Sequence, residues 1–263
     1  MNFLFGSFYY YSLIAMIILA VIIFVVLQFI TPAYGMTFNN RWGMSVNNKM
    51  GWLIMESPVF VAMTFLYLYS LKNGIKPFNW VTFSIFVFFQ LHYFQRSFVF
   101  PPLMRGSSKM PISIIAMGFF FNTMNAYMQG GWLFYVCPEI QYEISWFWSV
   151  PFIIGTILFF LGMVINMHAD RIIRALRKDK NDNNYYIPHG FLFNKISSAN
   201  YFGEILEWVG FAILSWSPSG LVFVLWSFAN IVPRSKAVYE RYIQFFGDDF
   251  KKLKRNKIFP YIY

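Results

Sequence analysis

Long apolar blocks alternate with short polar segments along almost the whole chain. Six of these blocks approach or exceed the roughly 20 residues that a helix needs to cross the hydrocarbon core of a bilayer. We expect helices at residues 9–30, 52–71, 80–98, 111–129, 146–167 and 205–232. The segment before the first block has no basic residue, so we interpret this block as a spanning helix and not as a cleaved signal.

The sixth block contains a turn signal, the sequence "SPSG" at residues 217–220. It is therefore either one long kinked helix or two helices joined by a tight turn. The basic residues favour two helices: with seven crossings and an external N-terminus, all of them except Lys72 and Lys76 fall on the cytoplasmic side. We therefore predict an all-α integral membrane protein with one domain over residues 1–263, seven transmembrane helices, the N-terminus outside and the C-terminus cytoplasmic.

The composition supports a membrane protein. Apolar residues make up 58% of the chain and charged residues 12%, which leaves more apolar surface than a soluble domain of 263 residues can cover. The net charge of +10 does not indicate nucleic-acid binding, because the basic residues lie in loops and in the tail. Cys137 is the only cysteine, so we expect no intrachain disulfide and no metal site. We expect membrane lipid around the chain, and neither nucleic acid nor an obligatory protein partner.

Several polar residues lie inside the apolar blocks. A carboxylate in hydrocarbon costs several kcal/mol, so such a residue is a candidate for function. Glu56, in "GWLIMESPVF", is either a functional acid or an interfacial one that contacts water. The segment "QLHYFQRSF" at residues 90–98 contains His92, Tyr93 and Arg96, which are either functional or interfacial anchors of the helix end.

A third polar group lies in "NTMNAYMQGG" at residues 122–131. Asn122, Asn125 and Gln129 are spaced i, i+3 and i+7, which places them near one face of a helix. Amides on one face of a membrane helix commonly form hydrogen bonds to neighbouring helices and hold a bundle together. A structural role is therefore the simpler interpretation for these three residues.

A polar stripe continues the fifth block beyond the membrane. Asn166, Asp170, Arg174 and Arg177 recur at steps of four, four and three residues within "GMVINMHADRIIRALR". The arginines either bind phosphate groups or form a solvated face with membrane anchors. Residues 169–199 and the tail are the only sizeable polar segments, so a charged cofactor is expected to bind there.

Common catalytic motifs are absent from the sequence. It contains neither a G-x-G-x-x-G or Walker loop nor histidines with zinc-like spacing, and it has no nucleophile elbow. If the chain is an enzyme, we expect a bound organic cofactor to supply the chemistry.

The ordered motifs resemble those of the steroid 5-alpha reductase family (3-oxo-5-alpha-steroid 4-dehydrogenases). The resemblance runs from Tyr34 to the C-terminal "FPYIY" and includes "GWLIMESP", "HYFQRSFVF", "NAYMQGG", "INMHADRIIRALR", "YYIPHGFLF", "SSANYFGEILEW" and the segment Arg234–Phe246. Membership would imply a seven-helix membrane enzyme that uses NADPH to reduce the Δ4 double bond of 3-ketosteroids.

The resemblance also implies roles for individual residues. Glu56 and Tyr93 would hydrogen-bond the C3 ketone while the nicotinamide gives hydride to C5, and Trp52 would form a wall of the steroid site. These residues belong to an N-terminal part, about residues 1–130, and the cofactor site to a C-terminal part, about 146–263. The implied cofactor residues are Asn166, Asp170, Arg174, Arg177, Tyr185, Asn200, Glu204, Arg234 and Tyr242, together with Arg105. No metal is implied.

The sequence is compatible with other functions. The chain could reduce another lipid enone, such as a polyprenol or an enoyl thioester. It could also be a membrane methyltransferase of the isoprenylcysteine carboxyl type, which uses S-adenosylmethionine, or a seven-helix transporter. Departures from the family at Tyr186, Phe191 and Val238 lie at the nucleotide end and leave the choice between NADPH and NADH open. The membrane is either a bacterial inner membrane or the endoplasmic reticulum.

Overall fold

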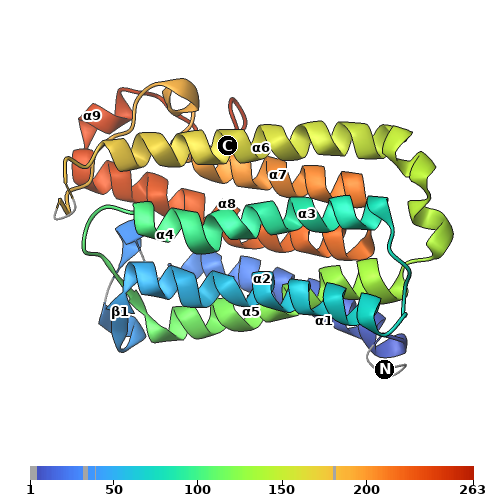
Figure 1. Cartoon of the computed structure of the whole chain (residues 1–263). Helices are drawn as coiled ribbons and strands as arrows, with labels where there is room; N and C mark the ends of the chain where they lie inside the picture. Colours follow the sequence, from blue (N-terminus) through green and yellow to red (C-terminus); the bar gives the residue numbers. More distant parts are fainter. Residues whose placement is uncertain (1–4, 32–34, 39, 180–181) are drawn as a thin grey trace.

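The computed structural model describes residues 5–31, 35–38, 40–179 and 182–263. It is a bundle of long helices that lie side by side along one axis (Figure 1), as expected for an all-α protein. The strongest contacts join α6 to α7, α2 to α5, α1 to α8 and α7 to α8. Tyr34, where the family resemblance begins, and Lys180 lie outside the described residues.

Each predicted apolar block contains helix. The long helices are α1 Ser7–Phe29, α2 Asn48–Lys72, α3 Trp80–Phe94, α5 Ile112–Gly131, α6 Val150–Ala175, α7 Ala199–Ser215 and α8 Pro218–Phe246. Within the described residues, α1, α2, α6 and α8 are long and apolar enough to cross a membrane. Seven crossings with an external N-terminus stay a prediction.

The sixth apolar block forms two helices, not one kinked helix. α7 ends at Ser215, and its C-cap Trp216 has left-handed backbone angles (φ 44°, ψ 43°). Ser217 then caps α8, because its side-chain oxygen accepts a hydrogen bond from the amide of Gly220 at 3.0 Å. Pro218 occupies the first turn of α8, where its missing N–H leaves no broken helical hydrogen bond.

The third block changes its winding before it ends. α3 gives way to a π-helical turn at Gln95–Val99, followed by the short helix α4, Phe100–Leu103. Pro101 and Pro102 have no backbone N–H, so a regular α-helical ladder cannot run through this segment. The wide turn therefore changes the direction of the side chains that follow Tyr93, and such π turns are frequent at functional sites.

Glycines allow α6 and α7 to approach closely. A Cβ atom at Gly162 would lie 2.3 Å from the backbone nitrogen of Glu207, and one at Gly203 would lie 2.5 Å from that of Asn166. Gly155 and Gly210 make equivalent contacts one heptad away. Small residues at this spacing let helix backbones touch, as is common in membrane bundles. The close approach places the polar ends of α6 and α7 against each other.

Short elements complete the fold. β1 Ser45–Asn47 pairs with β2 Lys109–Pro111 in an antiparallel ladder that sets Val46 opposite Met110. α9 Asp248–Lys251 and the loop after α6 lie at the same end of the bundle as β1 (Figure 1). The remaining helical turns are Gly35–Thr37, Asn40–Trp42, Trp132–Val136, Glu139–Tyr142, Ile144–Trp148 and Phe191–Asn194.

Candidate active site

One cavity of about 380 Å³ lies between the helices and contains nearly all of the predicted site residues. Twelve of the thirteen line it: Trp52, Glu56, Tyr93, Arg105, Asp170, Arg174, Arg177, Tyr185, Asn200, Glu204, Arg234 and Tyr242. The exception is Asn166, which is buried behind the wall and donates from Nδ2 to the backbone oxygen of Asn200 at 2.9 Å. The structure therefore brings together residues that are up to 190 positions apart in sequence.

The two predicted catalytic residues come from different helices and share a neighbour. Glu56 lies on α2 and Tyr93 on α3, and Tyr93 is 3% exposed. From α5, Asn125 Nδ2 donates to Tyr93 Oη at 2.9 Å and Asn122 Nδ2 donates to Glu56 Oε2 at 3.3 Å. The amide face of α5 does join helices as expected, but two of its partners are the predicted catalytic side chains.

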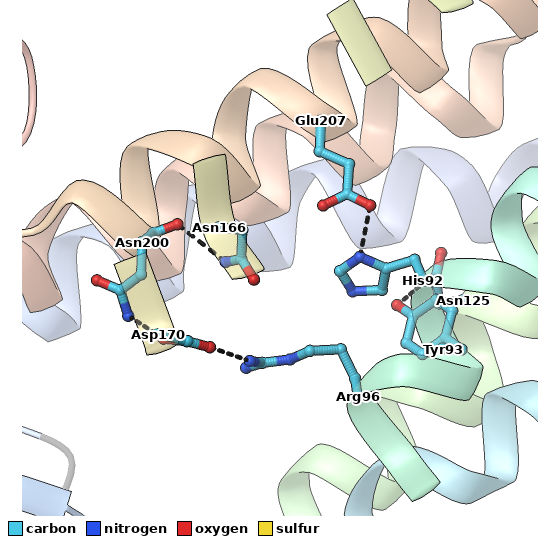
Figure 2. A network of polar contacts seen from close by, with 8 residues as sticks. All are labelled: His92, Tyr93, Arg96, Asn125, Asn166, Asp170, Asn200 and Glu207. Atoms are coloured by element: carbon cyan, nitrogen blue, oxygen red, sulfur yellow. Dashed lines mark hydrogen bonds and ion pairs between the residues drawn. The ribbon is translucent and has the colours of Figure 1, made fainter. Parts of the chain in front are cut away.

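A second polar network surrounds Asp170 (Figure 2). Its Oδ1 accepts a hydrogen bond from Asn200 Nδ2 at 3.1 Å, so α6 and α7 are joined at this point. Its Oδ2 lies 3.5 Å from Arg96 Nη1, an ion pair that does not have hydrogen-bond geometry. Asn166 orders the same region by fixing the backbone of Asn200.

Arg96 connects the Asp170 network with Trp52 on α2, although the sequence left open whether it is functional or an interfacial anchor. Figure 2 shows its guanidinium extending from the π turn toward Asp170. Its Cζ also lies 4.7 Å from the ring centre of Trp52 and 4.6 Å from that of Phe100. An arginine that anchors a helix at the interface reaches water, whereas Arg96 is 8% exposed. The available sequence signal was a cation inside an apolar block.

His92 and Glu207 form a further buried pair beside Tyr93. His92 Nδ1 lies 2.8 Å from Glu207 Oε1, and both side chains are almost fully buried. The His92 ring packs 4.3 Å from that of Trp208 and 5.0 Å from that of Tyr93, and His92 lines the cavity. Sequence reasoning gave neither residue a role, because their contact depends on how α3 and α7 face each other.

Loops build the far end of the cavity. Arg105 and Arg177 each donate to the other's backbone oxygen, and Arg177 Cζ lies 5.7 Å from the ring centre of Tyr185. The Tyr185 hydroxyl donates to the oxygen of Gly35 at 3.2 Å, and burial raises the pKa of this phenol. On α8, Arg234 Cζ lies 5.6 Å from the Tyr201 ring centre.

The lining fits a polyanionic nucleotide beside an apolar molecule. Five arginines and three carboxylates line the cavity, so its charge favours an anion such as a phosphate. Asp170 Oδ2 is buried and has no hydrogen-bond donor among the described residues, so a ligand hydroxyl or amide could satisfy it. Aromatic side chains line another part of the cavity and suit a flat apolar ligand: Trp52, Phe121, Trp208, Phe223 and Trp226.

The fold and the cavity define a helical protein of membrane character with a charged site buried between its helices. A family model described as "3-oxo-5-alpha-steroid 4-dehydrogenase" matches residues 108–263. Steroid 5-alpha-reductase DET2 of Gossypium hirsutum is 34% identical over 259 residues, which cover 97% of each chain. The 3-oxo-5-alpha-steroid 4-dehydrogenase 1 proteins of Mus musculus and Homo sapiens are 35% and 34% identical, over 88% and 82% of this chain and 88% and 80% of their own.

The chain belongs to the 3-oxo-5-alpha-steroid 4-dehydrogenase family, which is a family of oxidoreductases. The resemblance identified from the ordered motifs is therefore confirmed. The methyltransferase and transporter alternatives are set aside by this membership.

Proposed function

We propose that the protein reduces the Δ4 double bond of 3-keto-Δ4 steroids to 5-alpha-3-ketosteroids with hydride from NADPH. The observation that carries the proposal is the single cavity that unites the Glu56 and Tyr93 side chains with a cluster of arginines and carboxylates. The names of the relatives support the substrate class, since each describes a steroid reductase or a steroid dehydrogenase.

The proposed role of Tyr93 and Glu56 is to stabilise negative charge on the substrate. Hydride addition at C5 of an enone places charge on the C3 oxygen, which becomes an enolate. A hydrogen-bond donor held at that oxygen lowers the barrier, and a buried site makes the donor more effective. Tyr93 supplies one hydroxyl donor, and Glu56 in its protonated form supplies a second hydrogen bond to the same oxygen. The enolate then takes a proton at C4 from water, and the saturated ketone forms again.

The proposed cofactor site lies at the arginine-rich end of the cavity. When bound, reduced nicotinamide supplies the hydride. Arginines give bidentate hydrogen bonds to phosphates, which suits Arg105, Arg174, Arg177 and Arg234. Asp170, Asn200 and Glu204 accept from or donate to hydroxyl and amide groups, while Tyr242 lines the same end and Asn166 holds Asn200.

The proposed setting is a multi-pass integral membrane protein with seven crossings. The N-terminus lies outside and the C-terminus in the cytoplasm, in a bacterial inner membrane or in the endoplasmic reticulum. This orientation is supported by the distribution of basic residues, and the apolar character of α1, α2, α6 and α8 supports membrane insertion. A lipophilic steroid would then reach the cavity from the lipid, with Trp52 as part of its wall.

The first experiment measures steroid-dependent oxidation of NADPH by the protein purified in detergent. NADH is tested as a second donor, and the product is identified as the 5-alpha isomer. In Tyr93→Phe we expect kcat to fall by roughly 10²–10³-fold, the range seen when one oxyanion donor is removed. Glu56→Gln is expected to show a similar loss, and both variants should still bind NADPH.

Two results would change the proposal. Turnover of a polyprenol or thioester enone, but of no steroid, would keep the reductase and replace its substrate. Absence of NADPH binding would show that the assignments at Asp170, Arg177 and Asn200 are wrong.

A further inference from the structure

Two amides on one face of α5, those of Gln129 and Asn125, form a hydrogen-bonded chain that ends at Tyr93. Gln129 Nε2 lies 2.9 Å from the backbone oxygen of Ser219 and 3.2 Å from Asn125 Oδ1. Asn125 Nδ2 lies 2.9 Å from Tyr93 Oη. Asn125 and Gln129 are at most 1% exposed, so water does not compete for these groups.

The backbone oxygen of Ser219 fixes the direction of the whole chain. A carbonyl oxygen only accepts hydrogen bonds, so the Gln129 group that faces it must be the NH₂ group. The same NH₂ group donates to Asn125, and the atom of Asn125 that it meets must therefore be the oxygen. The Asn125 NH₂ group is then left to face Tyr93. The orientation of both amides thus follows from one unambiguous acceptor.

The phenol oxygen of Tyr93 is therefore an acceptor within the protein. Among the described residues, no side chain or carbonyl takes the proton of the Tyr93 hydroxyl. The proton remains available for a ligand in the cavity that Tyr93 lines. An N–H donor at the oxygen also becomes more favourable as negative charge grows there, because hydrogen bonds to charged groups are the stronger ones.

Asn122 provides a parallel contact at the other member of the pair. Its NH₂ group donates to the backbone oxygen of Met55 at 2.8 Å, which fixes its orientation in the same way. The same group lies 3.3 Å from Glu56 Oε2. Both predicted catalytic side chains thus receive an N–H group from α5, one helical turn apart.

We propose that Asn125 and Gln129 are positioning residues that turn the Tyr93 hydroxyl proton toward the substrate ketone. Gln129 fixes the orientation of the Asn125 amide. Because the Asn125 NH₂ group donates to the phenol oxygen, the Tyr93 hydroxyl can act as the donor to the ketone. Asn125 also stabilises the negative charge that grows on the phenol oxygen as the Tyr93 proton shifts toward the ketone oxygen. This proposal rests on the proposed reductase function and adds the element that prepares its acid.

The test replaces the donor with an acceptor of the same size. In Asn125→Asp, a carboxylate oxygen faces Tyr93, and the phenol then donates to it instead of to the ketone. We expect kcat to fall by roughly 10- to 100-fold, less than the loss of an oxyanion donor itself. NADPH affinity should stay within about twofold, because Asn125 lies outside the arginine-rich end. Gln129→Glu should lower kcat in the same direction, since a carboxylate cannot donate to Ser219.

A double-mutant cycle separates positioning from general stability. In a Tyr93→Phe background the phenol is absent, so Asn125→Asp should cause little further loss of residual turnover. The matched control is Gln90→Leu, which removes another buried amide that donates to the backbone oxygen of Phe60 at 3.0 Å and does not line the cavity. It should lower thermal stability and leave kcat unchanged.

Two outcomes would overturn the inference, and they are distinct. In the first, the wild type reduces an enone, but Asn125→Asp keeps the wild-type kcat, or the fold-loss in kcat of the double variant equals the product of the two single losses. The positioning role is then wrong, and the reductase function stands. If the wild type binds NADPH and reduces no enone, the proposed function fails and the positioning role fails with it.

Discussion

The two ends of the cavity are held by different chemistry. Around Glu56 and Tyr93, neutral amides on α5 contact the two proposed catalytic side chains, and both amides lie on a regular helix. Around Arg177 and Tyr185, the side chains are held by hydrogen bonds to loop backbone and by the contact of the Arg177 guanidinium with the Tyr185 ring. Rigid helices suit a site where a proton must be placed within tenths of an ångström, whereas loops suit a site that must admit a large anion. We therefore expect changes at the first end to affect kcat and changes at the second to affect KM for the cofactor.

The close contact of α6 and α7 supports both ends of the cavity. We therefore expect the largest loss of stability and of NADPH binding when this contact is disrupted. In Gly162→Leu the new side chain would begin 2.3 Å from the backbone of Glu207, and backbone cannot move aside as a side chain can. Overpacking of this kind costs about 3 kcal/mol or more. Thermal unfolding in detergent should show a protein that no longer folds cooperatively and binds no NADPH.

Leu161→Ala provides the control for this prediction. Leu161 precedes Gly162 on α6 and is exposed in the structure, so its truncation should leave both folding and NADPH binding nearly unchanged. A stable, active Gly162→Leu protein would mean that α6 and α7 are farther apart than described.

The next prediction concerns Arg96, which contacts both ends. Arg96→Met keeps much of the packing against Trp52 but leaves Asp170 as a buried carboxylate without its ion pair. Breaking one partner of a buried pair costs about 3–5 kcal/mol. We expect a lower unfolding temperature and weaker binding of both NADPH and steroid. This joint loss would distinguish Arg96 from residues that serve one end alone.

A second substitution sharpens the test of Arg96. Asp170→Asn added to Arg96→Met removes the unpaired charge and should recover part of the unfolding temperature, although not the affinity for NADPH. Lys109→Met, which removes an exposed cation that does not line the cavity, should change neither quantity. Equal destabilisation in the single and double variants would argue against an ion pair between Arg96 and Asp170.

The helices were predictable because the length of an apolar run is a local property, but their ends were not. α7 begins at Ala199, six residues before the predicted start at residue 205, because its first turns contain Asn200 and Glu204, which face a polar cavity. α6 likewise continues to Ala175 through the polar stripe. A prediction based on apolar runs ends where polar residues begin. It therefore underestimates the length of helices whose ends line the polar cavity.

The predicted site residues lie together, whereas their partners were not predictable. All of these residues except Arg105 lie in the ordered motifs, and one cavity contains twelve of the thirteen. The contact of Arg96 with Asp170 and that of His92 with Glu207 depend on how α3 is rotated against α6 and α7. No periodicity in one helix fixes that rotation, and the π turn after Tyr93 changes it further.

The smallest effect we predict concerns Asp182, which orders the loop at the proposed cofactor end of the cavity. Its carboxylate accepts hydrogen bonds from the amides of Asn184 and Lys178 and from the Tyr186 hydroxyl, at 3.0, 3.1 and 3.0 Å. These bonds, that from Asn184 first, hold the pKa of Asp182 below its ordinary value. Because the folded pKa is lowered, this support is complete above the unfolded pKa of about 3.9 and is lost as the pH falls through the folded pKa.

Asp182→Asn should therefore imitate the protonated loop at neutral pH. We expect KM for NADPH to rise by about twofold with kcat unchanged, since the same loop places the oxygen of Asn184 within 3.4 Å of Arg177 Nε. Hydrogen exchange at the amide of Asn184 should quicken in the variant at all pH values, and in the wild type only below about pH 4. A change in kcat instead of KM would mean that the two ends of the cavity are not separable, and the contrast between helix-held and loop-held chemistry would then have to be given up.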